Sequence, residues 1–241
     1  MSGSRDGSSF PGFRFGLGRP PGAVPSRDEY FTAWSASHGG YDPRGSRLVA
    51  AWLTLTYHAA RPLASVGVPP DLVTWVGATT SAVVVALAAV GGQWVVVAAG
   101  LVVLSGLLDN VDGAVAVLTG RATRWGYVLD SVVDRVCEAL YLLALWVLGA
   151  AASLCVAAGA LATLQEYARA RAGAAGMSEV GVVTVWERPT RVIVTALFLF
   201  VVGRSDEDAA AFWAGAGALA WLTLGLVGCA QLGLALRRLL R

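Results

Sequence analysis

Six long apolar segments between residues 72 and 236 constrain the fold of this chain more than any other feature. They cover approximately residues 72–91, 93–112, 126–149, 151–168, 189–203 and 209–236. A helix that crosses a bilayer needs about 20 mostly apolar residues. Only 14% of the residues are charged and the mean hydropathy is +0.63, whereas soluble domains carry about 25% charged residues. The sequence therefore predicts an all-α polytopic membrane protein with six transmembrane helices.

The distribution of arginine in the connections supports six spans. Connections that carry arginine alternate with connections that carry little or none. The arginine-rich positions are Arg44, Arg47 and Arg61, then Arg121 and Arg124, then Arg169, Arg171, Arg188 and Arg191, and finally Arg237, Arg238 and Arg241. Because arginine-rich loops stay on the cytoplasmic side, we expect a cell-membrane protein with both termini in the cytoplasm.

The N-terminal part of the chain differs in composition from the rest. Residues 1–47 are rich in Gly, Ser, Pro and Arg, which is typical of a flexible cytoplasmic arm. Residues 48–60 are apolar on one side but too few to span, so an interfacial helix on the membrane surface is expected there. We therefore expect two parts, an arm over 1–47 and a membrane-embedded domain over 48–241.

The basic residues limit the possible chemistry. All 18 are arginine, and the net charge of +2 gives no indication of nucleic-acid binding. P-loop phosphate binding and Schiff-base catalysis both need a lysine, so the sequence excludes them. Any cation that holds a phosphate here is an arginine, which can form two parallel hydrogen bonds to it.

Four aspartates stand close together in this apolar chain. Asp109 and Asp112 are three residues apart, and Asp130 and Asp134 are four apart, so each pair lies on one helical face. An Asp facing lipid at the centre of a span costs about 2.5–3.5 kcal/mol. The four acids are therefore expected to surround two divalent cations, Mg²⁺ or Mn²⁺, which oxygen ligands suit. The simpler alternative is pairing with arginines at 121, 124 and 135.

Two glycines accompany the acids. Gly113 directly follows Asp112, and Gly126 lies four residues before Asp130. A position without a side chain lets a bulky ligand approach the backbone. The pattern therefore favours a large anionic ligand held through metals, such as a diphosphate.

These residues resemble the signature of the CDP-alcohol phosphotransferase family, D-x-x-D-G-x-x-A-R followed after eight residues by G-x-x-x-D-x-x-x-D. The matching positions are Asp109, Asp112, Gly113, Ala116, Gly126, Asp130 and Asp134. The stretches "VPPDLVTWVG", "EYARARAG" and "ERPTR" resemble further elements, the last two being similar to the phosphatidylinositol-phosphate-synthase-like branch. Two positions depart from the pattern: Val117 stands where the family has Arg, and Asp71 where it has Asn.

The resemblance implies a six-helix homodimeric enzyme. It would transfer a phosphate-linked group from a CDP-linked lipid, such as CDP-diacylglycerol, to the hydroxyl of an acceptor alcohol and release CMP. Asp109, Asp112 and Asp130 would bind the metals, and Asp134 would act as general base and as a further ligand. The CDP moiety would contact Asp71, Thr74, Gly113, Ala116, Arg121 and Gly126.

The remaining cytoplasmic arginines bear on the acceptor. As a group, they favour a phosphorylated alcohol, and inositol phosphate is the acceptor that the resemblance suggests. The group consists of Arg124, Arg169, Arg171, Arg188 and Arg191. Two alternatives stay open at this point: a catalytically silent relative of the family, and a channel or transporter that uses the acids as a cation or proton path.

Overall fold

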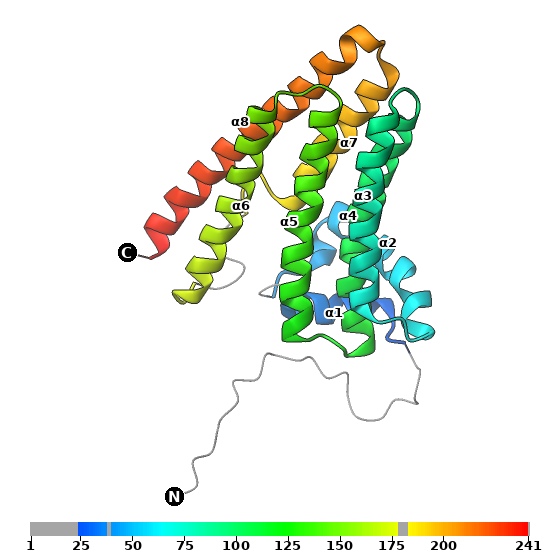
Figure 1. Ribbon diagram of the computed structural model, residues 1–241. Coiled ribbons are helices and arrows are strands. Elements are labelled where there is room, and N and C mark those ends of the chain that lie inside the picture. Colours follow the sequence, from blue (N-terminus) through cyan, green and yellow to red (C-terminus); the bar gives the residue numbers. More distant parts are fainter. Residues whose placement is uncertain (1–23, 38–39, 178–182, 241) are drawn as a thin grey trace, which may run out of the picture. The chain divides into compact units, whose positions relative to one another are not determined.

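The computed structural model describes residues 24–37, 40–177 and 183–240, and within them all but one of the regular elements are α-helices (Figure 1). The exception is the short 3₁₀ helix η1. The elements are α1 (Arg27–Ser37), η1 (Pro43–Gly45), α2 (Arg47–Ser65), α3 (Pro70–Val90), α4 (Trp94–Thr119), α5 (Arg124–Val147), α6 (Ala152–Ala174), α7 (Arg188–Arg204) and α8 (Glu207–Leu239). They form two compact units, one from residues up to 70 together with 110–127, and one from 71–109 together with 128 onward.

The six apolar segments correspond to helices α3 to α8, and the predicted all-α class is confirmed. Three of these helices, α3, α4 and α8, have both the length and the apolar composition to cross a membrane. Helices α5 and α6 carry several acids and arginines among their apolar residues, and α7 is 17 residues long. The chain is therefore a membrane protein with several spans, while the count of six stays a prediction.

The first unit is built around helix α2. Tyr57 on α2 donates a hydrogen bond from its hydroxyl to the carbonyl of Pro25 at 2.9 Å. Its ring packs beside the ring of Tyr30 on α1, with 5.9 Å between the two ring centroids. Further along the chain, the Arg121 guanidinium donates to the Gly67 carbonyl at 3.1 Å. Residues 24–47 of the predicted arm thus contain α1 and η1, while the arm's first 23 residues lie outside the described part of the chain.

The second unit is held by close helix packing. Helix α8 lies along both α6 and α7 (Figure 1). A Cβ atom on Gly203 would come within 2.6 Å of the Val96 backbone nitrogen, and one on Gly217 within 2.9 Å of Phe198. Such small residues let backbones approach one another, which is how helices associate where lipid replaces water. The polar residues of this unit lie on α4, α5 and α7, whose positions this packing determines.

Local capping explains where several helices begin and end. The Ser46 hydroxyl accepts a hydrogen bond from the Val49 amide at the start of α2, and the Asp206 carboxylate accepts one from the Ala209 amide at the start of α8. Both are preferred N-cap residue types. After α4, Gly120 adopts a φ of +66°, which favours glycine. The chain can therefore turn sharply between the two helices that carry the aspartates.

Candidate active site

Three of the four predicted acids converge within the second unit. Asp109 lies on α4, and Asp130 and Asp134 lie one turn apart on α5. One carboxylate oxygen from each residue lies within 4.8 Å of the others. The spacing of four residues puts Asp130 and Asp134 on the same face of α5, and this face meets Asp109. The structure thus produces a compact group of carboxylates from two helices.

The fourth acid, Asp112, follows Asp109 by three residues on α4 and has a buried side chain. It belongs to the first unit, whereas Asp109 is the last α4 residue of the second. Residues three apart on a helix lie on one face. Its membership of the acid group therefore rests on its spacing along α4 and stays a prediction.

Arg188 reaches the three acids from a third helix. It is the first residue of α7, directly after Glu187 and before Pro189, whose ring suits the first turn of a helix. Its guanidinium lies 2.9 Å from Asp109 and also pairs with Asp134. A guanidinium between two carboxylates can donate to each and still offer donors to a further anion. Arg188 therefore links the acids of α4 and α5 to the start of α7.

A second set of charges lies one turn further along α5. Arg135 is 2.9 Å from Glu138 and 3.4 Å from Glu166, and it approaches Asp134 at 3.7 Å. From α7, Arg191 donates to Glu138 at 2.8 Å and to Glu166 at 3.0 Å. Two arginines and two glutamates from α5, α6 and α7 therefore form one ion-pair network.

The network is balanced and largely buried. Arg191 is fully buried and Glu138 nearly so. Ionisable residues within membrane helices are costly unless they pair with one another. Here two positive and two negative side chains compensate, and Arg135 connects them to Asp134. The network therefore fixes the position of Arg135 and, through it, the environment of Asp134.

A third ion pair holds the segment that precedes α7. Arg169 of α6 forms two hydrogen bonds with the Glu187 carboxylate, at 2.9 and 2.8 Å. The backbone amide and the hydroxyl of Thr184 also donate to Glu187, at 2.7 and 2.9 Å. These contacts immobilise the residue next to Arg188. Arg169 thus acts on the site by fixing where α7 begins.

The same contacts change the acidity of Glu187. Burial alone would raise the pKa of this carboxyl, but the hydrogen bonds from Arg169 and Thr184 lower it below its ordinary value. A lowered pKa means that the ion pair stabilises the fold at neutral pH. That contribution is lost only when the pH falls through the lowered value, below the ordinary pKa of about 4.3 for Glu.

Comparison with known proteins shows which family has these residues. The sequence profile of the CDP-alcohol phosphatidyltransferase family matches residues 68–227, a range that contains all four aspartates and Arg188. The chain belongs to the CDP-alcohol phosphatidyltransferase family. It is accordingly an enzyme that transfers a phosphatidyl group from a CDP-linked donor to an alcohol. The transporter and the silent-relative alternatives are not supported.

Two curated relatives illustrate how far the likeness extends. The phosphatidylinositol phosphate synthase of Cutibacterium acnes is 32% identical over 201 residues, which cover 78% of this chain and 95% of that protein. The archaetidylinositol phosphate synthase of Aeropyrum pernix is 35% identical over 124 residues, covering 52% of this transferase and 63% of the relative. Both names refer to inositol phosphate chemistry.

Solved structures of a further relative share the fold. The phosphatidylinositol phosphate synthase of Mycobacterium tuberculosis with CDP-diacylglycerol bound matches with a TM-score of 0.59 and 26% identity, over 74% of this transferase and 94% of that chain. The same enzyme in complex with manganese and citrate matches with a TM-score of 0.61 and 26% identity, over 76% and 88% of the two chains. The transferase therefore has the fold of an enzyme seen with a CDP-lipid and with a divalent metal.

The residues predicted to contact CDP occur in both units of the transferase. Thr74 is buried and Asp71 is half-buried at the start of α3 in the second unit, while the others belong to the first. A Cβ atom on Gly113 would meet nothing within 4 Å, so there is free space beside this backbone. The Gly126 amide instead donates to the Thr123 hydroxyl at 2.9 Å, which caps α5. Their part in CDP binding stays a prediction.

The position of the missing family arginine has a nearby cation. Val117 is half-buried on α4, and Ala116 beside it is also half-buried. Four residues after Val117, Arg121 has one guanidinium nitrogen on the Gly67 carbonyl. An arginine has five N–H donors, so this bond leaves most of them for other partners. Arg121 is thus one candidate to replace the cation that Val117 lacks.

The predicted acceptor arginines divide into two kinds. Arg169 and Arg191 are committed to glutamates by short, multiple contacts. Arg124 and Arg171 are exposed, on α5 and α6. Arg188 lies directly against the acids. Among the predicted acceptor arginines of the second unit, Arg188 is the one that contacts the acid group in the described residues.

Sequence reasoning named Arg135 only as an alternative partner of the acids, which its approach to Asp134 agrees with, and it missed the roles of Glu138 and Glu166. Glu138 continues the four-residue spacing of Asp130 and Asp134 along one face of α5, so a signal for it existed. Glu166 is the first residue of the stretch "EYARARAG" on α6. Its partners, Arg135 and Arg191, lie on two other helices, and the spacing along one helix cannot reveal contacts between helices.

Proposed function

We propose that this transferase moves the phosphatidyl group of CDP-diacylglycerol to a hydroxyl of inositol phosphate and releases CMP. The observation that carries the proposal is Arg188, which lies at 2.9 Å from Asp109 and also pairs with Asp134. An arginine at this position gives the phosphate of an acceptor a binding partner next to the reacting groups. The named relatives, which are inositol phosphate lipid synthases, support the same acceptor.

The acid group suits a pair of divalent cations. Asp109, Asp130 and Asp134 offer only carboxylate oxygens, within 4.8 Å of one another, and hard cations such as Mg²⁺ and Mn²⁺ prefer such ligands. We include Asp112 as a fourth ligand on its helical spacing. Bound cations would neutralise the diphosphate of the donor and the CMP that leaves.

Asp134 is the residue proposed to take the proton of the acceptor. The acceptor oxygen forms a new bond to the phosphorus of the phosphatidyl group, and the bond from that phosphorus to CMP breaks. The proton of the attacking hydroxyl passes to a carboxylate oxygen of Asp134. Because Arg188 contacts Asp134, a phosphate bound to Arg188 would hold a neighbouring hydroxyl of the same molecule close to this base.

Different arginines have different parts in this scheme. Arg188 holds the acceptor phosphate, and exposed Arg171 and Arg124 contribute to its attraction. Arg191 holds Glu138 and Glu166, and Arg169 holds Glu187. The latter two are proposed as positioning residues, because their carboxylate partners lie outside the acid group. Arg188 instead pairs with two acids of the group itself, which bound cations would occupy.

The membrane arrangement is proposed in the same way. Helices α3 to α8 would span the bilayer, with both termini in the cytoplasm and the enzyme a homodimer. We expect thiol reagents outside the cell to label cysteines introduced at Gly92 and Asp206, in the α3–α4 and α7–α8 connections. Labelling from the cytoplasmic side alone would contradict this topology.

The decisive experiment is CMP release from CDP-diacylglycerol with a panel of alcohols. We expect turnover with inositol phosphate and little with inositol, glycerol or serine, which lack a phosphate for Arg188. Replacing Arg188 with Gln should raise the KM for inositol phosphate by about tenfold to a hundredfold, because a charge-assisted contact contributes about 1.5–3 kcal/mol. The KM for CDP-diacylglycerol should change much less.

The matched control is Arg204→Gln, which removes the same charge at the exposed far end of α7. It should leave both KM values unchanged. Equal turnover with inositol and with inositol phosphate would overturn the proposed acceptor while leaving the family's reaction intact.

A further inference from the structure

Helix α2 of the first unit has three distinct faces. One face is buried within the unit and includes Leu53, Tyr57 and Ala60. A second face is apolar but exposed, and its residues recur at intervals of four, three and eleven: Leu48, Trp52 and Leu55 within the helix and Val66 at its C-cap. A helix with such an exposed apolar stripe lies favourably at a membrane surface.

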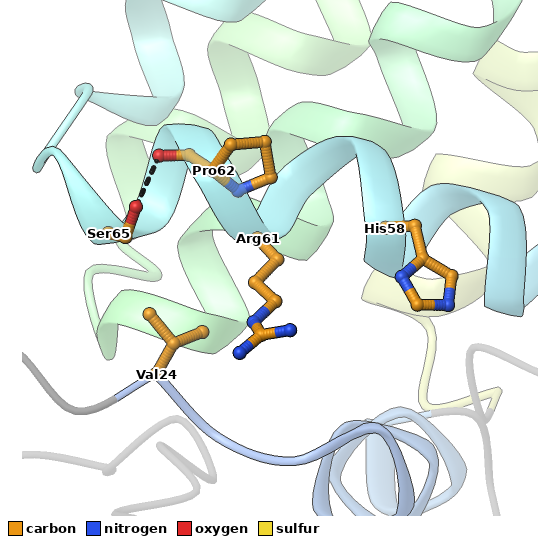
Figure 2. Close-up of a pocket in the computed structure, with 5 residues that line it drawn as sticks. All are labelled: Val24, His58, Arg61, Pro62 and Ser65. Atoms are coloured by element: carbon orange, nitrogen blue, oxygen red, sulfur yellow. Dashed lines mark hydrogen bonds between the residues drawn. The ribbon is translucent and has the colours of Figure 1, made fainter.

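The third face is polar and borders the apolar stripe. His58, Arg61 and Ser65 follow one another at intervals of three and four residues, so their side chains leave the helix on one side. Together with Val24 and Pro62 they line a cavity of about 560 Å³ (Figure 2). The Ser65 hydroxyl donates to the Pro62 carbonyl at 2.7 Å and keeps two lone pairs for a further donor. The cavity is thus lined by one guanidinium, one imidazole and one hydroxyl group.

Within the described part of the chain, Arg61 has no acidic partner. Among the residues that the structure describes, no salt bridge joins Arg61 or His58 to a carboxylate, whereas Arg27 and Arg44 of the same unit pair with Asp28 and Asp42. The polar lining is therefore suited to an anion. An arginine with an imidazole N–H beside it matches a phosphate, which accepts several hydrogen bonds at once.

We propose that this cavity binds the headgroup phosphate of an anionic phospholipid of the bilayer, at a site separate from that of the CDP-linked donor. The exposed apolar stripe on the same helix offers a surface along which acyl chains can lie. Within the described residues no acid lines the cavity, so the cationic headgroup of a zwitterionic lipid would find no counter-charge. The preferred ligand is therefore a lipid with a net negative charge.

The proposal can be tested on the full chain in detergent by native mass spectrometry. Phosphatidylglycerol or phosphatidylcholine is titrated into the purified protein, and the bound lipid molecules are counted. We expect phosphatidylglycerol to bind about tenfold more tightly than phosphatidylcholine, and Arg61→Gln to remove most of this difference, because a tenfold change corresponds to a single charge-assisted contact. His58→Gln should weaken binding by a smaller factor.

The matched control is Arg47→Gln, which removes an exposed arginine about 21 Å away along the same helix. It should change lipid affinity by less than twofold. Equal losses of phosphatidylglycerol affinity in Arg47→Gln and Arg61→Gln would show a general attraction between charges and would contradict a specific site at Arg61. Competition by inorganic phosphate at concentrations similar to those of the lipid would overturn the assignment to a lipid. CMP release by each variant verifies that it is folded.

Discussion

Replacing Asp134 with asparagine is expected to reduce the turnover of this transferase by about a thousandfold, because positioned general bases contribute about 10²–10⁴ to a rate. The amide keeps the shape of the side chain but cannot take the acceptor's proton. CMP release should therefore collapse at saturating metal, while the affinity for CDP-diacylglycerol, measured by direct binding, stays within a few-fold of the original.

The control for this variant is Asp208→Asn, which removes an exposed acid from the first turn of α8. Its turnover should equal that of the unchanged enzyme. Normal turnover of Asp134→Asn would show that another group takes the proton. A parallel loss of donor binding would instead show that Asp134 mainly holds the metal and the donor.

Removal of divalent metal is the second large effect that we expect. A chelator should abolish CMP release, and Mg²⁺ or Mn²⁺ should restore it, because the acid group provides only oxygen ligands. Binding of Mn²⁺, followed by electron paramagnetic resonance, should saturate at two ions per chain. Asp109→Asn and Asp130→Asn should each weaken this binding by more than about tenfold, since even outer-shell partners contribute that much.

Asp208→Asn again serves as the control and should leave Mn²⁺ binding unchanged. Saturation at one ion per chain would contradict the two-ion proposal. Unaltered Mn²⁺ affinity in Asp130→Asn would exclude this acid as a ligand, whatever the variant's activity.

Much of the fold could be predicted from the apolar segments, since burial in lipid demands long helices with internally paired backbones. The six predicted segments agree with α3 to α8 to within a few residues at most ends. The α7–α8 and α3–α4 connections followed from short polar breaks. Helix α1 was not predicted, because residues 27–37 are neither strongly apolar nor clearly periodic.

The acids of the site could also be predicted, because Asp130 and Asp134 share a face at a spacing that the sequence displays. The contact of Arg188 with Asp109 and Asp134 could not. It depends on how α7 packs against α4 and α5, and 54 residues separate Arg188 from Asp134. The same limit applies to Arg191, which as a cytoplasmic arginine suggested ligand binding but is fully buried against Glu138.

The ion-pair network has a consequence for the order in which the chain enters the membrane. Arg191 follows Glu138 by 53 residues, so at about 5–20 residues per second a ribosome completes it about 3–10 seconds later. During that interval Glu138 of α5 has no Arg191 to pair with, because α7 has not yet been made. Arg135, on the same helix and 2.9 Å from Glu138, can pair with it from the moment α5 coils. Arg135, which directly follows the proposed base Asp134, can therefore neutralise Glu138 until α7 is made.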